Sequence, residues 1–377
     1  MSARALWLSL ALCACDGAGG RQFCKLGAEH EVTRTHAKQI DGVELVALGA
    51  GVIALWSEPS GLFGRRLDGE GRARYPAVRL GVRCEGGLAA TTEGNGLAVA
   101  CLLHPTHGKQ DEPGGVALLR LTSELALASS TAIGVAGGLS EGVALARGER
   151  GLEVVWHDGS PEAQRVWWAS LGEPEQSPQV VSEPGRLASA PSISAHARGT
   201  VMAWAENWLQ GEELHSRIVF WDRRAPPRTL VPLVHFAATP QLFALGDHVV
   251  LGFRDRHAGQ KTGLYLARVP ASGERAQAPA RVGRADGVGR PALLPCMNGV
   301  VAATPRTYGG DYFVGINWLD RELERARGEQ QFYEDAHAFT QVAAACAGSQ
   351  AVLLIAEFPQ LHRDSAALRA VSYRCQK

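Results

Sequence analysis

Carboxylate residues recur at one position of a repeated pattern in this sequence. They are Glu58, Asp158, Glu206, Asp255 and Glu357. Two further copies of the pattern carry Leu103 and Arg306 at the same position. A ring of carboxylates at the mouth of a channel would bind a cation or a polyhydroxylated ligand, with Arg306 available to an anionic group. The alternative is structural, because Asp and Glu also end strands, cap turns and keep sheet edges soluble. A residue type that recurs in most units of a repeat favours this interpretation.

Segments next to these carboxylates, predicted as loops, carry further binding chemistry. Trp208 lies close in sequence to His215 and to two glutamates, a composition typical of a sugar-binding surface and equally of a long loop that folds back and is anchored by its Trp. Arg254 and Arg306 would hold a carboxylate or phosphate by bidentate pairing. The ligand-binding candidates are Glu58, Asp158, Glu206, Trp208, Arg254, Asp255, Arg306, Tyr308 and Glu357.

Motifs of established catalytic chemistry are not evident in the sequence. His104 and His107 form an H-x-x-H spacing, which in a loop is a weak metal signal without a third ligand. We find no nucleophile elbow, no phosphate-binding glycine loop and no H-E-x-x-H motif. The sequence therefore predicts no catalytic residues, no metal site and no cofactor.

The elements that must position these residues are short apolar strands that repeat. The strand ending in Trp56 and Glu58 begins at Gly51, and its copies begin at Gly96, Gly151, Gly199, His248, Gly299 and Gln350. The steps are 45, 55, 48, 49, 51 and 51 residues. An apolar stretch precedes each copy, and a polar segment, a third strand and a weaker fourth strand follow it. Each unit is thus predicted to be a four-stranded antiparallel meander.

One such meander cannot bury both faces of its apolar second strand. Radial stacking of seven units as the blades of a β-propeller supplies the missing partners. Trp56, Trp156, Trp204 and Phe253 share one repeat position and are expected to pack between blades. The fold class is therefore all-β, a seven-bladed propeller, with a right-handed β-helix as the alternative.

Ring closure and the repeat positions predict how the cysteines pair. The seventh unit ends one strand short, and the segment 29–36 is expected to supply that strand from the N-terminus. This would pair Cys24 with Cys375 and stabilise the ring by roughly 4 to 5 kcal/mol in the loop-entropy model. Cys296 and Cys346 lie at nearly equivalent places in neighbouring units. Cys84 and Cys101 remain as the third pair.

The N-terminus indicates export. Arg4, a short apolar run and small residues describe a signal peptide too short to span a membrane. The run Leu12-Cys13-Ala14-Cys15 resembles the lipobox of bacterial lipoproteins, which implies cleavage before Cys15 and lipidation of that residue; an ordinary signal peptide is the alternative. We expect a signal peptide over 1–14, a Gly-rich tether over 15–22 and one propeller domain over 23–377.

The whole plan resembles seven-bladed β-propeller lipoproteins of bacteria, a likeness of architecture and not of a named family. Lys and Arg total 38 against 38 Asp and Glu, which argues against nucleic-acid binding. We expect a monomeric domain, attached to the membrane through its lipid on the non-cytoplasmic side of the cell envelope, that binds an unidentified envelope protein or glycan. The alternative is a propeller-type glycoside hydrolase or lyase that uses carboxylates at the channel mouth.

Overall fold

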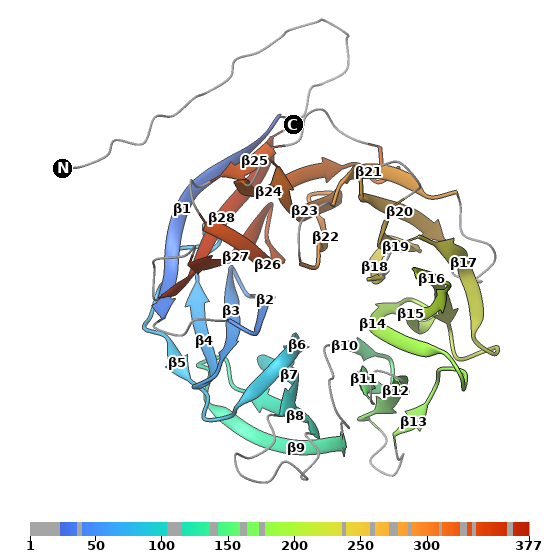
Figure 1. Cartoon of the computed structure of the whole chain (residues 1–377). Coiled ribbons are helices and arrows are strands. Elements are labelled where there is room, and N and C mark those ends of the chain that lie inside the picture. Colours follow the sequence, from blue (N-terminus) through green and yellow to red (C-terminus); the bar gives the residue numbers. More distant parts are fainter. Residues whose placement is uncertain are drawn as a thin grey trace, which may run out of the picture.

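The computed structural model shows a ring of seven blades around a central axis (Figure 1). It describes residues 23–35, 40–103, 115–135, 142–158, 164–172, 178–235, 239–256, 261–270, 278–285, 289–308, 311–324, 330–333, 337–359 and 365–376. These residues form seven four-stranded antiparallel sheets, so the predicted propeller is confirmed.

Each blade is numbered here from the first complete meander. Blade one contains β2 (Gly42–Leu48), β3 (Gly51–Glu58), β4 (Gly61–Leu67) and β5 (Val78–Arg79). Blade two contains β6 (Cys84–Glu93), β7 (Gly96–Leu103), β8 (Gly115–Leu121) and β9 (Leu127–Val135). Blade three contains β10 (Val143–Gly148), β11 (Gly151–Asp158), β12 (Arg165–Ser170) and β13 (Gln179–Val180). Blade four contains β14 (Leu187–His196), β15 (Gly199–Gln210), β16 (Glu213–Trp221) and β17 (Arg228–Val234).

The remaining blades follow the same order. Blade five contains β18 (Gln241–Leu245), β19 (His248–Asp255), β20 (Gly263–Val269) and β21 (Ala280–Arg284). Blade six contains β22 (Ala292–Cys296), β23 (Gly299–Tyr308), β24 (Asp311–Leu319) and β25 (Gln330–Tyr333). Blade seven contains β26 (His337–Ala347), β27 (Gln350–Pro359) and β28 (Ala366–Gln376), with β1 (Phe23–Thr35) as its outermost strand. The second strands begin at the seven residues that the repeat predicted.

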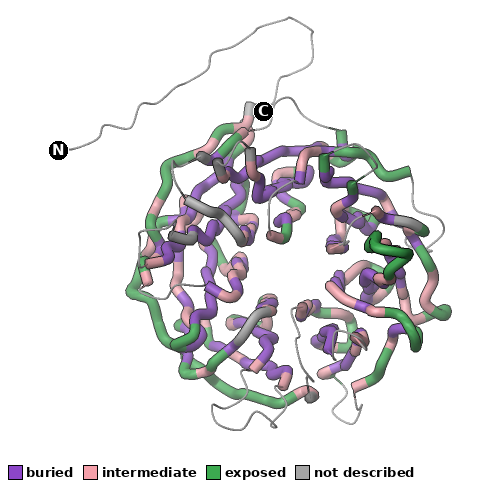
Figure 2. Tube along the Cα trace, viewed as in Figure 1, coloured by how far each residue is buried: buried purple, intermediate pink, exposed green. Residues whose placement is uncertain are grey.

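The second strand is the core of each blade because both of its faces are covered. In β3 every residue from Val52 to Glu58 is buried, and Figure 2 shows the same buried band in the other blades. Trp56 packs with residues of blade seven, Trp156 with blade two and Trp204 with blade three. Each large aromatic therefore fills the gap to the preceding blade, as expected for this repeat position.

The innermost strands are joined to the next blade by side-chain hydrogen bonds. The Ser192 hydroxyl accepts a bond from the backbone N–H of Leu242 (2.9 Å), and the amide of Gln341 donates to the backbone carbonyl of Asp41 (3.1 Å). Gln241 donates in the same way to the carbonyl of Pro291. These contacts fix the chain where it enters blades five, one and six.

The ring is closed by the N-terminal strand, as the sequence predicted. β1 pairs with β28 in antiparallel register, from Phe23 opposite Gln376 to Thr35 opposite Ala366. The disulfide between Cys24 and Cys375 joins this strand pair. The first and last described segments of the chain thus complete a single blade.

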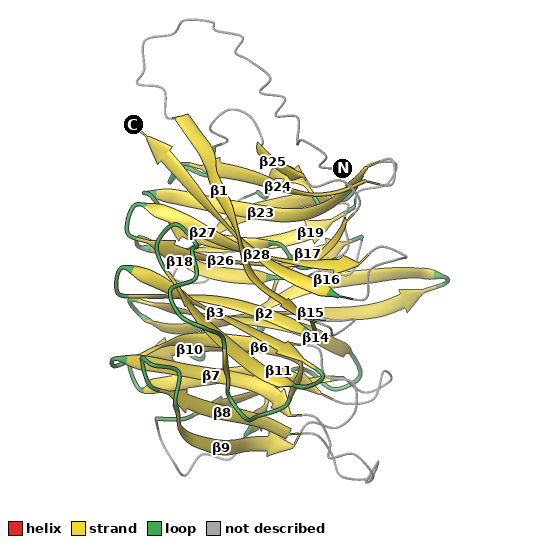
Figure 3. Cartoon of the chain, turned by 90° about the vertical axis from the view of Figure 1, so that its left-hand side faces the viewer, coloured by secondary structure: helices red, strands yellow, loops and turns green. Residues whose placement is uncertain are grey.

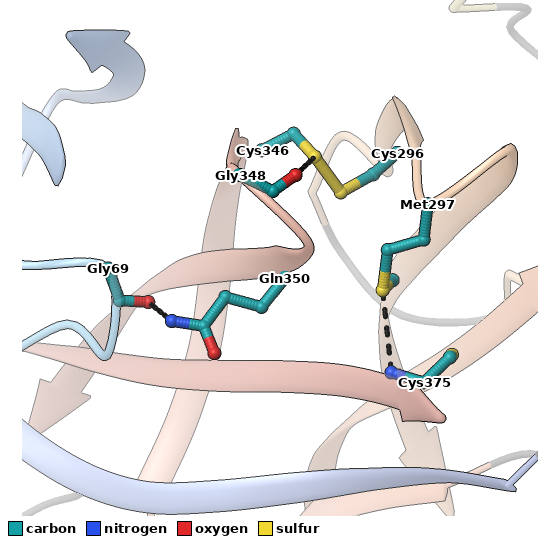
Figure 4. The surroundings of a disulfide bond; sticks show 7 residues. All are labelled: Gly69, Cys296, Met297, Cys346, Gly348, Gln350 and Cys375. Atoms are coloured by element: carbon teal, nitrogen blue, oxygen red, sulfur yellow. Dashed lines mark hydrogen bonds between the residues drawn. A yellow bond between two sulfur atoms is a disulfide. The ribbon is translucent and has the colours of Figure 1, made fainter. Parts of the chain in front are cut away.

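Two further disulfides confirm the predicted pairing. Cys84 and Cys101 join β6 to β7 within blade two, and Cys296 and Cys346 join the innermost strands of blades six and seven. Figure 4 shows the second of these together with Met297, whose sulfur accepts a hydrogen bond from the backbone N–H of Cys375 at 3.4 Å. The covalent links therefore concentrate around blade seven, where the ring closes.

Candidate functional site

The five predicted carboxylates lie near the ends of second strands, all on one face of the ring. That face carries the connections between second and third strands and between blades, and we refer to it as the upper face. All five side chains are buried: Glu58, Asp158, Glu206, Asp255 and Glu357. The axis is surrounded by the first strands of the blades and not by the second strands. The carboxylates therefore lie within and between the blades. The sequence had predicted a position near the mouth of the central channel.

Glu58 and Glu206 hold the indole of the Trp two residues earlier. The Nε1–H of Trp56 donates to Glu58 Oε1 at 3.0 Å, and that of Trp204 donates to Glu206 Oε1 at 3.3 Å. The hydroxyl of Thr35 adds a bond to Glu58 Oε2 at 2.6 Å across the boundary with blade seven. A Trp and an acid two residues apart share one face of a strand, so the acid satisfies the buried indole donor.

Arginines of the third strand pair with two of the carboxylates. Arg217 donates from Nε to Glu206 Oε2 at 2.7 Å, and Arg369 pairs with Glu357 and with Glu29 of the closing strand. These ion pairs neutralise the charge that burial would otherwise make costly. They also tie the second strand to the third strand.

The remaining carboxylates, Asp158 and Asp255, also accept hydrogen bonds. Asp158 accepts a hydrogen bond from the indole of Trp167. Asp255 Oδ1 accepts backbone N–H bonds from His235 and Arg256, both at 2.7 Å. All five carboxylates are thus engaged in contacts that stabilise the fold, in line with the structural alternative. Ligand binding by them stays a prediction.

Trp208 belongs to a hairpin and not to a loop. β15 and β16 continue as a paired ribbon through Trp208 opposite His215, Leu209 opposite Leu214 and Gln210 opposite Glu213. Pairing of β15 with β14 stops at Asn207, and pairing of β16 with β17 stops at Ser216. Figure 3 shows this ribbon extending outward from blade four. The sequence suggested a loop because Glu and Gly interrupt the apolar pattern there.

The two faces of this ribbon differ. The Trp208 ring stacks on His215 with centroids 5.9 Å apart, and the guanidinium of Arg186 lies 5.2 Å from the same ring. Leu209 and Leu214 occupy the opposite face, because successive residues of a strand alternate. These two residues are 70% and 39% exposed. The Trp therefore anchors the ribbon, and the two leucines are presented to solvent.

Arg254 lies on the second strand of blade five, and Arg306 lies on the second strand of blade six. Arg254 donates from Nη1 to the carbonyl of Gly289 at 3.1 Å, at the entry to blade six. Arg306 is buried, with its guanidinium 4.9 Å from the ring of Phe313. Tyr308 ends β23. Both arginines thus make contacts within the scaffold, Arg254 with the entry to blade six and Arg306 with the third strand of that blade.

Some predicted features lie outside the described residues. They include the signal peptide, the tether with Cys15, and the histidines His104 and His107. Within the described part of the chain, no helix is long and apolar enough to cross a bilayer. The three disulfides indicate an oxidising, non-cytoplasmic compartment.

Two charged residues of the first strands were not among the predicted site residues. Glu44 lies on β2, and Arg290 lies just before β22. Burial raises the pKa of Glu44 to about 7, opposed by a hydrogen bond from the Leu45 backbone N–H and by the positive charge of Arg290. The available signal was a departure from the repeat, because most other blades have a small residue at each of these two positions.

Comparisons with known proteins identify the fold class. No protein-family model and no curated protein matches the sequence. Among solved structures, the polysaccharide lyase Uly1 has a TM-score of 0.55 at 8% identity, covering 93% of this chain and 99% of that chain. A PL25 ulvan lyase gives 0.53 at 9% identity, with 89% and 95% covered. A puromycin hydrolase mutant gives 0.50 at 15% identity, with 83% of this chain and 50% of that chain covered. At these identities the likeness concerns the propeller fold alone.

Proposed function

We propose that this chain is an exported interaction module that binds another protein of the cell envelope through the β15–β16 ribbon. The observation that carries the proposal is the pair Leu209 and Leu214, exposed side by side on a ribbon that extends from the ring. Glu212 and Glu213 are exposed beside them. A partner that fits this tip has an apolar pocket bordered by basic side chains.

A protein partner fits the ribbon better than a glycan does. Sugar-binding surfaces use the open face of an aromatic ring, whereas the ring of Trp208 already contacts His215 and Arg186. The exposed side chains on the opposite face of the ribbon are the aliphatic Leu209 and Leu214. Aliphatic side chains in a well-packed pocket contribute through burial of apolar area, which a polyhydroxylated ligand does not supply.

The polarity of the closing strand supports an envelope module anchored through Cys15. Thr35, at the end of β1, bonds to Glu58 on the upper face, so Phe23 at the start of β1 lies toward the opposite face. A lipid-anchored tether would join the ring at that opposite face. The ribbon, which projects on the upper side, would then point away from the membrane.

Binding is also better supported than glycoside hydrolysis or lyase chemistry by the second-strand acids. Two catalytic carboxyl groups must converge on one bond of the substrate. Glu58, Glu206 and Glu357 are instead each engaged by Trp, Thr or Arg side chains of the scaffold. Glu44, whose pKa is raised, has Arg290 as its charged neighbour.

The test uses the full chain in intact cells, with a photo-reactive amino acid at Leu209 or Leu214. We expect one protein to be cross-linked from both positions, and the same purified protein to bind the chain in vitro. Replacing both leucines by Ala should weaken that binding at least about tenfold. Matched controls are Leu127→Ala and Val180→Ala, since both residues are also exposed and lie on outermost strands.

The proposal fails if the double Ala variant binds the captured protein as tightly as the unmodified chain does. It fails equally if the chain retains a glycan and the double Ala substitution abolishes that retention, because the ribbon would then be a glycan site.

A further inference from the structure

Positive charge is concentrated in blade five although the whole chain is neutral. Residues 254–290 contain eight Lys and Arg against three Asp and Glu, whereas the complete sequence has 38 of each kind. A local excess of one sign in a neutral chain is typical of a surface that meets a partner of the opposite sign. The fold brings four of these cations to the upper end of the blade, as the strand register and the hydrogen bonds show.

The strand register brings Arg256 and Arg284 to the uppermost row of blade five. Asp255, at the end of β19, is opposite Gly263 at the start of β20. Gly263 is in turn opposite Arg284 at the end of β21. Arg256 directly follows Asp255 in the chain. Arg256 and Arg284 therefore lie at the same end of the blade, with β20 between them.

Arg281 and Lys261 extend this row of cations. The guanidinium of Arg281 donates from Nη2 to the backbone carbonyl of Lys261 at 3.2 Å. The Nε atom of Arg281 lies 2.7 Å from the position that a Cβ would take at Gly263. The Arg281 side chain thus lies across the glycine and reaches the connection between β19 and β20. A larger residue in place of Gly263 would displace it.

The backbone beneath these side chains is held by hydrogen bonds. The N–H of Ala285 donates to the carbonyl of Thr262 at 2.9 Å, which joins the end of β21 to the connection before β20. Asp255 Oδ1 accepts the backbone N–H groups of His235 and Arg256, both at 2.7 Å. Because the backbone is already ordered on both sides of the row, a ligand that binds the cations has little backbone left to order.

The cations reach solvent, whereas the acid beside them does not. Arg256, Lys261 and Arg281 are exposed, and Arg284 is half-buried. Asp255 is only 3% exposed. We call Arg256, Lys261, Arg281 and Arg284 the blade-five rim. One buried carboxylate offsets only part of the charge of four cations, so the described residues at this end of the blade present positive charge to solvent.

The surroundings of the blade-five rim favour an extended anionic ligand over a folded protein. The centre of a protein interface is apolar and poor in charge. Within the described part of the chain, the exposed large apolar residues are Tyr75, Val78, Leu127, Val180, Leu209 and Leu214, and none of them belongs to blade five. The rim instead distributes its cations over strands that lie about 4.8 Å apart. Such a row suits a polymer that carries anionic groups at intervals.

We propose that the blade-five rim binds a linear acidic polysaccharide, whose sugar residues carry carboxylate or sulfate groups. The guanidinium groups of Arg256 and Arg281 match such anions through paired N–H donors, and Lys261 adds a point charge between them. Successive anionic groups of the polymer contact successive strands of the blade. The site is separate from the leucines of the β15–β16 ribbon and goes beyond the proposed protein partner.

Charge-removing substitutions on the rim provide the test. Arg256→Gln combined with Lys261→Gln removes two exposed charges and leaves the Lys261 carbonyl in place for Arg281. The matched control is Arg72→Gln combined with Arg74→Gln, which removes the same charge from two exposed arginines of blade one. Lys261→Gln alone is the second rim variant if the double substitution unfolds the chain.

The experiment measures binding to the full chain by calorimetry, with polygalacturonate, dextran sulfate, neutral dextran and a single-stranded oligothymidylate as probes. We expect at least one acidic polysaccharide to bind at least about tenfold more tightly than dextran, and added salt to weaken that binding. The tighter of the two acidic polysaccharides identifies carboxylate or sulfate as the preferred anion.

The variants should separate the rim from general charge. The double rim variant should bind the acidic polysaccharide at least about tenfold more weakly, and the matched control less than about twofold more weakly. Replacing Leu209 and Leu214 by Ala should leave polysaccharide binding unchanged, since the ribbon is a different surface.

Three results would overturn the site. The first is that neither acidic polysaccharide binds more tightly than dextran. The second is an equal loss of binding in the folded rim variant and in the matched control, which would assign the effect to net charge. The third is tighter binding of the oligothymidylate than of both acidic polysaccharides, which would make the rim a nucleic-acid site. Because the rim variants retain both leucines of the ribbon, none of these results bears on the proposed protein partner.

Discussion

Glu44 is a carboxyl group that the fold holds in a poorly solvated position. Its pKa is about 7 in the folded chain against an ordinary value of 4.5. Between these pH values the folded state binds more protons than the unfolded state. The free energy of unfolding therefore falls as pH rises through this window.

Glu44→Gln should remove this pH dependence. The variant is expected to match the unmodified chain near pH 4 and to exceed its free energy of unfolding by about 1 to 2 kcal/mol at pH 8, after allowance for partial solvation. Urea unfolding at the two pH values measures the difference. Equal differences at both pH values would contradict the assignment of the raised pKa to this residue.

Glu206 illustrates the opposite case, a buried carboxylate with complete partners. Glu206→Gln keeps the shape and removes the charge that Arg217 and the Trp204 indole use. We expect a loss of about 3 kcal/mol in the free energy of unfolding, measured in urea. Glu213→Gln, at the exposed tip of the same hairpin, should stay within about 0.5 kcal/mol. A similar loss in both variants would mean that the buried contacts contribute little.

At the scale of the element, the closing strand is the part of the ring most dependent on partners far away in sequence. Without residues 23–35, β28 would become an unpaired edge and blade seven would lack its outermost strand. We expect the shortened chain to lose cooperative unfolding and to self-associate. Adding a peptide of residues 23–35 should restore a single transition, through a disulfide between its Cys24 and Cys375. An unchanged transition in the shortened chain would contradict this role of β1.

The strands themselves were predictable from local chemistry. Apolar runs between Gly turns located all seven second strands. The seventh unit lacked a fourth strand, and this predicted that the N-terminal segment supplies it as β1. The environment of the acids was not predictable, because it depends on which side chains face them from other strands. The partner of Glu58, for example, is Thr35, which is 23 residues away in sequence and in the closing blade.

Glu44 and Arg290 show a second reason why the prediction of functional residues from the sequence falls short. Glu44 and Arg290 are unremarkable residues in the sequence and become informative only once strand register aligns them with Ala, Gly and Thr of other blades. The ribbon of blade four was missed as a hairpin for a different reason. Its pairing extends through Gln210 and Glu213, residues that also suit a loop.

At the scale of the whole molecule, the three disulfides differ in the length of chain they close. The sequence separations are 351, 50 and 17 residues for the pairs that begin at Cys24, Cys296 and Cys84. In the loop-entropy model the stabilisation grows with that length, from roughly 3 kcal/mol for the shortest loop to about 5 kcal/mol for the longest. Removing the link between Cys24 and Cys375 should therefore cost the most.

The check is thermal unfolding of three variants, each with one pair of cysteines changed to Ser. We expect the transition temperature to fall furthest for the Cys24 and Cys375 variant and least for the Cys84 and Cys101 variant. The reverse order would show that local packing, and not chain length, governs these links.

The order of synthesis separates the closing strand from its partner in time. β1 is made first, and its partner β28 is made last, 351 residues later at the level of the joined cysteines. At a synthesis rate of about 5 to 20 residues per second, β1 waits roughly 20 to 70 s for that partner. During this interval both edges of the strand are open to other chains. A ribosome that stalls before the last blade therefore leaves a ring that no later step can close, whatever the stability of the six blades already made.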